Sequence, residues 1–174
     1  MLMVAGLMSL AINAQVQTDT LADDAVLEVC DSVAVQAYDF AFETRDGRQL
    51  RLSALPAGFP DRLTLLMFYD PDCTDCRQEL FAMRHSSQLR QAVRRGWVQV
   101  LCVYAEHDEA LWRETAGELP KAWMVARATD VDGVHRHYDL SAMPVLLLLN
   151  TERYVLQQAY EFVEMNGILS AITH

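Results

Sequence analysis

A C-x-x-C motif at the start of a predicted helix is the feature that most limits what this chain can fold into. It follows the run Leu63–Tyr69, whose residues are apolar or favour β structure and suffice for one buried strand. The next residues, Asp70–Asp72, break the strand, because Pro and Asp both favour turns. Cys73 and Cys76 come directly afterwards, and residues 76–95 have the pattern of a helix. The sequence therefore predicts a strand, a turn and a helix, with the cysteines at the junction.

This position favours redox chemistry over the other uses of a C-x-x-C motif. At a helix N-terminus, unpaired N–H groups and the helix dipole favour a thiolate at Cys73. A zinc site needs a second ligand pair, and none stands at finger spacing. Covalent haem attachment requires His directly after the second cysteine, where this chain has Arg77. A structural disulfide stays as the alternative, although so small a loop would constrain the unfolded chain little.

The composition is that of a globular protein with one packed domain. The chain has 174 residues, 52% of them hydrophobic, which is enough for a single core. Its formal net charge of −10 argues against binding of nucleic acids. Four cysteines are too few for a disulfide scaffold, and the two outside the motif, Cys30 and Cys102, are expected to be inert. No apolar run reaches the length of a transmembrane helix.

The N-terminal residues 1–14 have the pattern of a secretory signal peptide. They carry no charge and end in Asn-Ala before Gln15, as a cleavage site would. No Lys or Arg precedes the apolar core, and a sequence that begins downstream of the true start would explain this. In addition, Ile12 stands at a position where a small residue is usual. The alternative is a short N-terminal helix of a cytosolic protein. We expect export, an acidic lead-in over 15–36, and one domain over 37–174.

Short elements are expected on both sides of the motif. Asp46–Gly47 is a strong hairpin signal between residues 38–42 and 49–52. Gly96 is expected to end the helix, and the apolar run 97–104 then completes a right-handed β-α-β unit whose sheet is covered on both faces. The other expected elements are a helix from His107 to Gly117, a short strand at 123–125, a helical turn at 134–140, strands at 145–149 and 154–156, and a helix at 162–172. We therefore predict an α/β fold with a central mixed sheet flanked by helices.

The order of these elements resembles the thioredoxin-like fold with an added N-terminal β-hairpin. More narrowly, it resembles the TlpA-like family of extracytoplasmic thiol–disulfide oxidoreductases. Four segments over residues 37–172 carry the likeness to this family, namely Asp39–Leu55 at the hairpin, Phe68–Cys76 at the active-site turn, Tyr138–Pro144 before a cis-proline, and Asn150–Val155 at the closing hairpin. Each motif is weak alone, and their order and spacing support the resemblance.

The resemblance implies a role for each residue around the motif. Cys73 would be the attacking thiol and Cys76 the resolving one. Pro144 would be the cis-proline that faces the disulfide, with backbone groups of Met143 binding a substrate strand. Glu79 matches a glutamate that some family members hold beneath the active site, where it could take the proton from Cys76. The alternative for Glu79 is a solvated position on the helix.

The chain also departs from the family pattern near the motif. Asp72 replaces a usual tryptophan, Thr74 and Asp75 replace a usual x-Pro pair, and Phe81 stands where a proline often kinks the helix. We expect Asp72, Thr74 and Asp75 to contact the substrate, and we expect a straighter helix. A peroxiredoxin does not fit, because its Thr three residues before the cysteine is replaced by Asp at position 70.

These observations predict a thiol–disulfide oxidoreductase that reduces disulfides of exported proteins in the periplasm. We expect a monomer that takes electrons from a membrane thiol donor, and the sequence shows no metal, nucleotide or flavin site. His135 and His137 are expected to be solvated. Carboxylates close to Cys73 oppose its thiolate, which favours a reductant. The alternatives are a binding module of the same fold without turnover, and a dithiol oxidase or isomerase.

Overall fold

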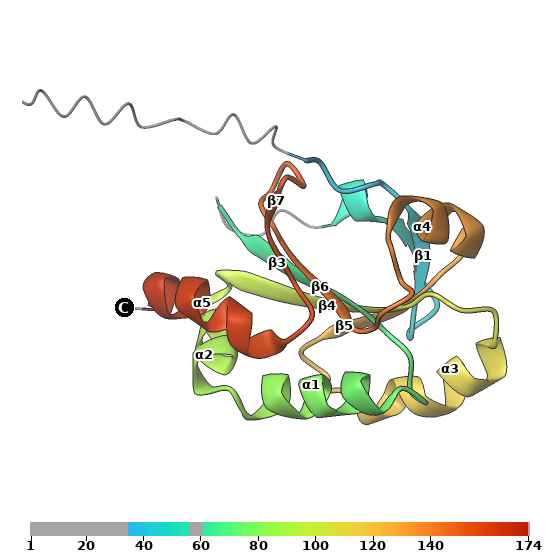
Figure 1. Ribbon diagram of the computed structural model, residues 1–174, viewed down its shortest axis with the longest axis horizontal. Helices are drawn as coiled ribbons and strands as arrows, with labels where there is room; N and C mark the ends of the chain where they lie inside the picture. Colours follow the sequence, from blue (N-terminus) through green and yellow to red (C-terminus); the bar gives the residue numbers. More distant parts are fainter. Residues whose placement is uncertain (1–34, 56–60, 174) are drawn as a thin grey trace, which may run out of the picture. The chain divides into compact units, whose positions relative to one another are not determined.

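A seven-stranded mixed sheet forms the centre of the part of the chain that the structure, a computed structural model, describes, namely residues 35–55 and 61–173 (Figure 1). The strand order is β2-β1-β5-β4-β3-β6-β7. Neighbours β3, β4 and β5 run parallel, whereas β1, β2, β6 and β7 pair antiparallel with their neighbours. The strands are β1 Ala41–Thr44, β2 Gln49–Arg51, β3 Leu63–Tyr69, β4 Val98–Tyr104, β5 Met124–Ala128, β6 Val145–Leu149 and β7 Val155–Ala159. This confirms the predicted α/β class, while the predicted signal peptide and Cys30 lie outside the described residues.

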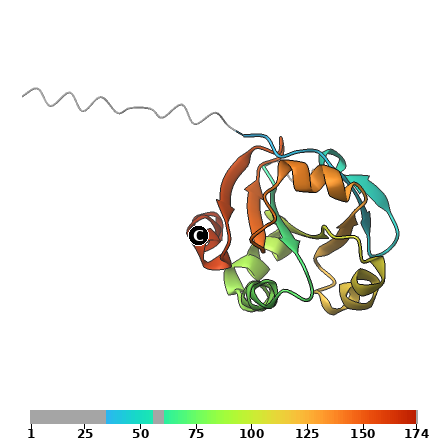
Figure 2. The same cartoon turned by 45° about the vertical axis from the view of Figure 1, so that its right-hand side comes forward.

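Helices cover both faces of the sheet, as the apolar strands predicted. Figures 1 and 2 show α4 on one face and α1, α2, α3 and α5 on the other. The helices are α1 Thr74–His85, α2 Ser87–Arg95, α3 Glu109–Thr115, α4 Val131–His137 and α5 Asn166–Thr173, with short 3-10 turns at η1 Leu52–Ala54, η2 Ala116–Glu118 and η3 Phe162–Met165. None of the helices within the described ranges is long and apolar enough to cross a membrane.

The alternation of side chains along β3 divides the core into two layers. Leu65, Met67 and Tyr69 pack with the helices α1, α2, α3 and α5. Leu66 and Phe68 point the other way and pack with α4 and the N-terminal hairpin. Because successive side chains of a strand face opposite sides, one continuous apolar run supplies both layers.

The single helix predicted over 76–95 is wrong, because the chain breaks it at Ser86. This residue adopts an extended conformation, with φ −65° and ψ 118°, between α1 and α2. Its hydroxyl accepts a hydrogen bond from the N–H of Leu89 at 3.1 Å and so caps the start of α2. α1 runs through Phe81 from Thr74 to His85 without a break, and the straighter helix expected at that position stays a prediction. Gly96 ends α2 as predicted, with a φ of 76° that favours glycine.

One smaller prediction also needed correction. The helical turn expected at 134–140 begins earlier, at Val131, because the Asp130 carboxylate accepts a hydrogen bond from Gly133 N and caps α4. Both histidines of α4 are exposed, as predicted, and each also has a contact with another residue. The ring of His137 stacks on Tyr38 with centroids 3.7 Å apart, and Nε2 of His135 lies 2.8 Å from the carbonyl oxygen of Ala105.

Candidate active site at the C-x-x-C turn

The turn between β3 and α1 places both cysteines of the motif at one end of the sheet. The carboxylate of Asp70 accepts a hydrogen bond from Asp72 N at 2.8 Å, and the carbonyl of Asp70 accepts one from Cys73 N at 3.1 Å. These bonds turn the chain sharply after Tyr69. Because β3 and β4 are parallel, Tyr69 and Tyr104 are partners at the same edge, and the motif lies where both strands end.

The two cysteines of the motif differ in exposure and in bonding. Cys73 is half-buried and is the N-cap residue of α1, and its Sγ accepts a hydrogen bond from Cys76 N at 3.2 Å. Cys76 lies in the first turn of α1 and is fully buried. Burial, and then the hydrogen bond with Cys73, raises the pKa of the Cys76 thiol well above its usual range. The accessible sulfur of the pair is therefore Cys73, while Cys76 holds its proton.

The loop before β6 brings a backbone carbonyl to the accessible sulfur. The Cys73 thiol donates to the carbonyl oxygen of Met143 at 3.7 Å. The Met143–Pro144 peptide bond is cis, which confirms that prediction. β6 pairs antiparallel with β3 and starts with Val145 opposite Phe68, so this loop meets the turn after β3. Met143 is half-buried and Pro144 is buried, and their role in binding a substrate stays a prediction.

The side chains on either side of Cys73 are exposed to solvent. Asp72, Thr74 and Asp75 are all exposed, as contact with a substrate would require. Arg77, an exposed residue in the first turns of α1, stabilises the turn, and the sequence did not predict this role. Its guanidinium donates to the carbonyl of Pro71 at 2.9 Å and to the hydroxyl of Thr74 at 3.2 Å. Its place one helical turn after Thr74 is the sequence signal for this contact.

Glu79 has a partner that neither interpretation of the sequence predicted. Its carboxylate accepts a hydrogen bond from the backbone N–H of Phe162 at 2.6 Å, and the side chain is half-buried. This bond links α1 to the first residue of η3. Glu79 therefore fixes the helix that carries Cys76 against a distant segment, and its part in proton transfer stays a prediction.

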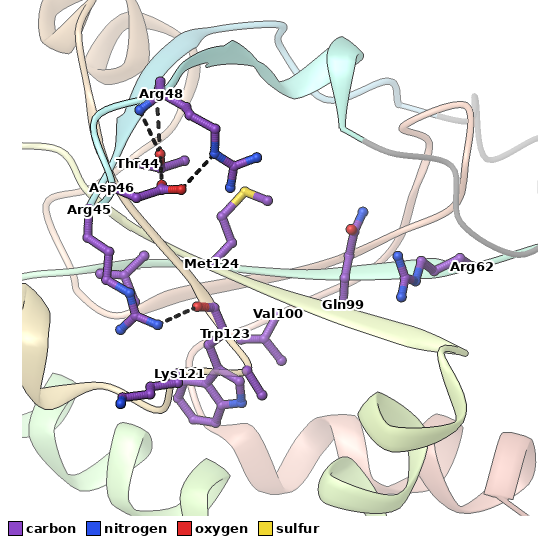
Figure 3. A pocket seen from close by; sticks show the side chains of 12 residues that line it. Thr44, Arg45, Asp46, Arg48, Arg62, Gln99, Val100, Lys121, Trp123 and Met124 are labelled. Carbon is purple, nitrogen blue, oxygen red and sulfur yellow. Dashed lines mark hydrogen bonds and ion pairs between the residues drawn. The ribbon is translucent and has the colours of Figure 1, made fainter.

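The opposite end of the sheet holds a cavity of about 450 Å³ that is lined mostly by polar side chains (Figure 3). Arg45, in the β1–β2 hairpin, donates to the carbonyl oxygens of four residues, Ala116, Leu119, Pro120 and Trp123. Arg62 and Gln99, which also line the cavity, donate to Gly96 O and to the Thr64 hydroxyl. The bonds of Arg45 tie the hairpin to the segment before β5, and those of Arg62 and Gln99 join the chain around the starts of β3 and β4, so the polar groups here hold the fold together.

Within the described ranges, no group of three or more His, Cys, Asp or Glu residues could hold a metal ion. Cys102 lies in the middle of β4 and is fully buried, as predicted. Burial raises the pKa of its thiol to about 12. This thiol stays protonated and inaccessible, which leaves Cys73 as the accessible thiol among the described residues.

Comparison with solved structures shows a thioredoxin-like fold. A conserved protein of unknown function from Bacteroides fragilis is 27% identical over 78% of this chain and 96% of its own, with a TM-score of 0.69. A thioredoxin-like protein from Bacteroides caccae is 24% identical over 79% of this chain, which spans about half (49%) of that longer protein, with a TM-score of 0.71. The thioredoxin domain of a thiol–disulfide oxidoreductase from Bacteroides vulgatus is 16% identical over 81% of this chain and 97% of its own, with a TM-score of 0.67. No protein-family model and no curated protein matches the chain.

Proposed function

We propose that this chain, which has the thioredoxin-like fold, is a TlpA-like thiol–disulfide oxidoreductase that reduces disulfides of exported proteins. The observation that carries the proposal is the asymmetry of the dithiol. Cys73 is accessible at the N-terminus of α1 and faces the Met143 carbonyl, while Cys76 is buried behind it. One thiol that can be reached and a second that cannot are what a two-step exchange requires.

In the first step the Cys73 thiolate attacks one sulfur of a substrate disulfide. The substrate S–S bond breaks, a Cys73–substrate disulfide forms, and the second substrate sulfur leaves as a thiolate that takes up a proton. Cys76 then loses its proton and attacks Cys73 Sγ, which releases the first substrate sulfur. Two electrons and two protons pass to the substrate, and a Cys73–Cys76 disulfide remains. A dithiol donor, which we propose to be a membrane thiol protein, reduces this disulfide in turn.

The second step needs an acceptor for the Cys76 proton, because burial holds that thiol protonated. We propose Glu79, which lies one helical turn after Cys76 and therefore on the same side of α1. Its hydrogen bond from Phe162 N holds the carboxylate in place. The exposed Asp72, Thr74 and Asp75 and the Met143–Pro144 loop would contact the substrate chain on the open side of Cys73.

The direction of the reaction follows from the charges around the turn. Asp70, Asp72 and Asp75 form no ion pair within the described part of the chain. Nearby carboxylates disfavour a thiolate, and a less stable thiolate makes a dithiol more reducing. The proposed setting is the periplasm, which fits the signal-like residues 1–14. Equilibration with glutathione tests the direction, and a potential near −120 mV, about that of a strong oxidant, would contradict it.

Trapping of the intermediate tests the proposed function itself. In a Cys76→Ser variant the first step proceeds but the second does not, so a disulfide-bonded polypeptide such as insulin should stay attached to Cys73. Mass spectrometry after non-reducing separation should find the adduct on Cys73, and dithiothreitol should release it. A Cys73→Ser variant is the matched control and should form no adduct. Absence of any adduct, with a partner still bound non-covalently, would support the binding module instead.

A further inference from the structure

The cavity at the end of the sheet remote from the motif carries an excess of positive charge (Figure 3). Its lining includes a single carboxylate, that of Asp46, and four basic side chains, those of Arg45, Arg48, Arg62 and Lys121. The chain as a whole has the opposite balance, with 14 basic and 24 acidic residues. Because a cleft lined by charges of one sign concentrates their field, this cavity should attract anions.

Three of the four cations have no carboxylate partner. Nε of Arg48 lies 2.8 Å from the Asp46 carboxylate, whereas Arg45, Arg62 and Lys121 form no ion pair within the described residues. A space of about 450 Å³ is only about 10 Å across, about one Debye length in about 0.1 M salt, so these charges act on the same occupant. They favour an occupant with more than one negative charge.

Three of the cations also keep donor groups for an occupant. Arg48 and Arg62 each donate through Nε, to a carboxylate and to a backbone carbonyl, and their Nη atoms make no hydrogen bond with the described residues. The side chain of Lys121 is exposed, and its ammonium group is bonded to none of those residues either. Arg45 differs, because backbone carbonyls accept from both of its Nη atoms. It therefore contributes its charge to the cavity.

The free donors reach the cavity from three different segments of the chain. Figure 3 shows Arg48 extending from the β1–β2 hairpin, Arg62 from the residue before β3, and Lys121 from the segment before β5. A phosphate group suits donors on several sides, because it offers three acceptor oxygens, whereas a carboxylate accepts in one plane. A phosphate monoester also carries about −1.5 to −2 charges at pH 7.

The same cavity has room for an organic group beside the phosphate. Val100, Trp123 and Met124 form an apolar part of its lining, and Met124 is only half-buried. The volume of about 450 Å³ lies within the range of about 300–1,000 Å³ that is usual for small-molecule sites. An inorganic phosphate ion alone would leave the apolar part uncovered.

We infer that this cavity binds a phosphate monoester. Arg48, Arg62 and Lys121 donate to the phosphate oxygens, the charge of Arg45 adds to the attraction, and the organic group packs against the apolar part of the lining. The site lies at the end of the sheet opposite the C-x-x-C motif. Binding therefore requires no dithiol exchange, and its test is independent of the proposed function.

Three anions test the site on the unaltered chain. Phenyl phosphate has the phosphate and an apolar group, inorganic phosphate lacks the apolar group, and benzoate has an apolar group with one negative charge. In calorimetric titrations at low salt, we expect phenyl phosphate to bind about tenfold more tightly than either of the others. Added salt should weaken its binding, because it screens exposed charges. Phenyl phosphate that binds no more tightly than benzoate or inorganic phosphate would overturn the inference.

A pair of matched variants locates the binding in this cavity. Lys121→Gln removes a free donor without breaking any bond among the described residues, and should weaken the binding of phenyl phosphate about fivefold. Arg136→Gln is the control, because it removes the same charge from an exposed position on α4 outside the cavity, so the affinity should be unchanged. Equal affinities in the two variants would overturn the site.

Vesicles that contain phosphatidic acid distinguish a lipid phosphate from a soluble one. The unaltered chain should stay in the supernatant when the vesicles are sedimented, as a soluble ligand requires. Sedimentation of the unaltered chain but not of the Lys121→Gln variant would support the same phosphate site and assign the phosphate to a lipid headgroup. Disulfide reduction by the Lys121→Gln variant should equal that of the unaltered chain, so loss of the proposed function would leave these titrations unaffected.

Discussion

The two ends of the central sheet use their polar groups in opposite ways. At the end remote from the motif, Arg45 donates to four backbone carbonyls and closes the hairpin onto the segment before β5 (Figure 3). Beside the C-x-x-C turn, Cys73 is accessible, and its thiol lies 3.7 Å from the carbonyl oxygen of Met143. Polar groups with all their partners stabilise a fold, whereas an accessible thiol at a helix N-terminus is free to react. The comparison predicts that substitutions at the motif end change activity, whereas substitutions at the opposite end change stability.

The largest expected effect is on activity and comes from Cys73→Ser. The substitution removes the attacking sulfur, so turnover of a peptide disulfide should fall about a thousandfold or more. Stability should change by less than about 1 kcal/mol, because the serine hydroxyl can still accept the hydrogen bond from Cys76 N. Initial rates and urea unfolding check the two halves of the prediction. A large loss of stability would show that this end also holds the fold.

The reverse effect is expected from Arg45→Met at the opposite end. Methionine keeps much of the apolar stem but leaves the four carbonyls without their charged donor, so the free energy of unfolding should fall by about 2–4 kcal/mol. Turnover per folded molecule should stay unchanged. Arg48→Met is the control, since its ion pair with Asp46 is exposed and its loss should leave the free energy of unfolding nearly unchanged. Loss of turnover in the folded Arg45 variant would contradict the separation of the two ends.

The elements that carry the motif could be predicted from the sequence because their signals are local. The apolar run of β3, the Asp and Pro residues after it and the apolar run of β4 lie within about forty residues of one another. Gly96 ends α2 where its left-handed conformation requires glycine. Ser86 was missed although it is a good N-cap residue, because the apolar pattern continues through it into α2.

The partners of individual side chains could not be predicted, because they come from distant parts of the chain. Glu79 and Phe162 are 83 residues apart, and Arg45 bonds to residues 71 to 78 positions away. The cavity of about 250 Å³ between α1 and η2 depends on how these two segments pack, and no local sequence pattern indicates that packing. Cys73 and Cys76 were recognisable from the sequence, whereas the surroundings that distinguish them came only with the fold.

The buried thiol of Cys102, inside the sheet between the two ends, should make the free energy of unfolding depend on pH in the alkaline range. Burial raises the pKa of Cys102 to about 12, whereas a cysteine in an unfolded chain titrates near about 8.5. Above about pH 8.5 the unfolded chain loses a proton that the folded chain keeps. This stabilisation is therefore complete below that pH and is lost at about 1.4 kcal/mol per pH unit as the pH rises toward 12.

A Cys102→Ala variant isolates the contribution of this thiol. Its free energy of unfolding should fall less steeply than that of the unaltered chain between about pH 9 and 11, by about 1.4 kcal/mol per pH unit. Urea unfolding across that range measures the two slopes. Equal slopes would mean that the thiol of Cys102 ionises as easily in the folded chain as in the unfolded one.

The smallest expected effect on activity comes from Glu79→Gln, which tests whether a residue at the motif end serves the reaction, the fold or both. The amide oxygen of glutamine can still accept the hydrogen bond from Phe162 N, so stability should change by less than about 1 kcal/mol. The amide cannot take the proton of Cys76, whose pKa burial raises above its usual range. Release of product from the Cys73 mixed disulfide should therefore slow about fivefold at pH 7. The difference should shrink toward pH 10, where hydroxide removes the proton without help. Stopped-flow measurement of product release across pH 6–10 tests this, and parallel profiles for the two chains would leave Glu79 only its structural bond between α1 and η3.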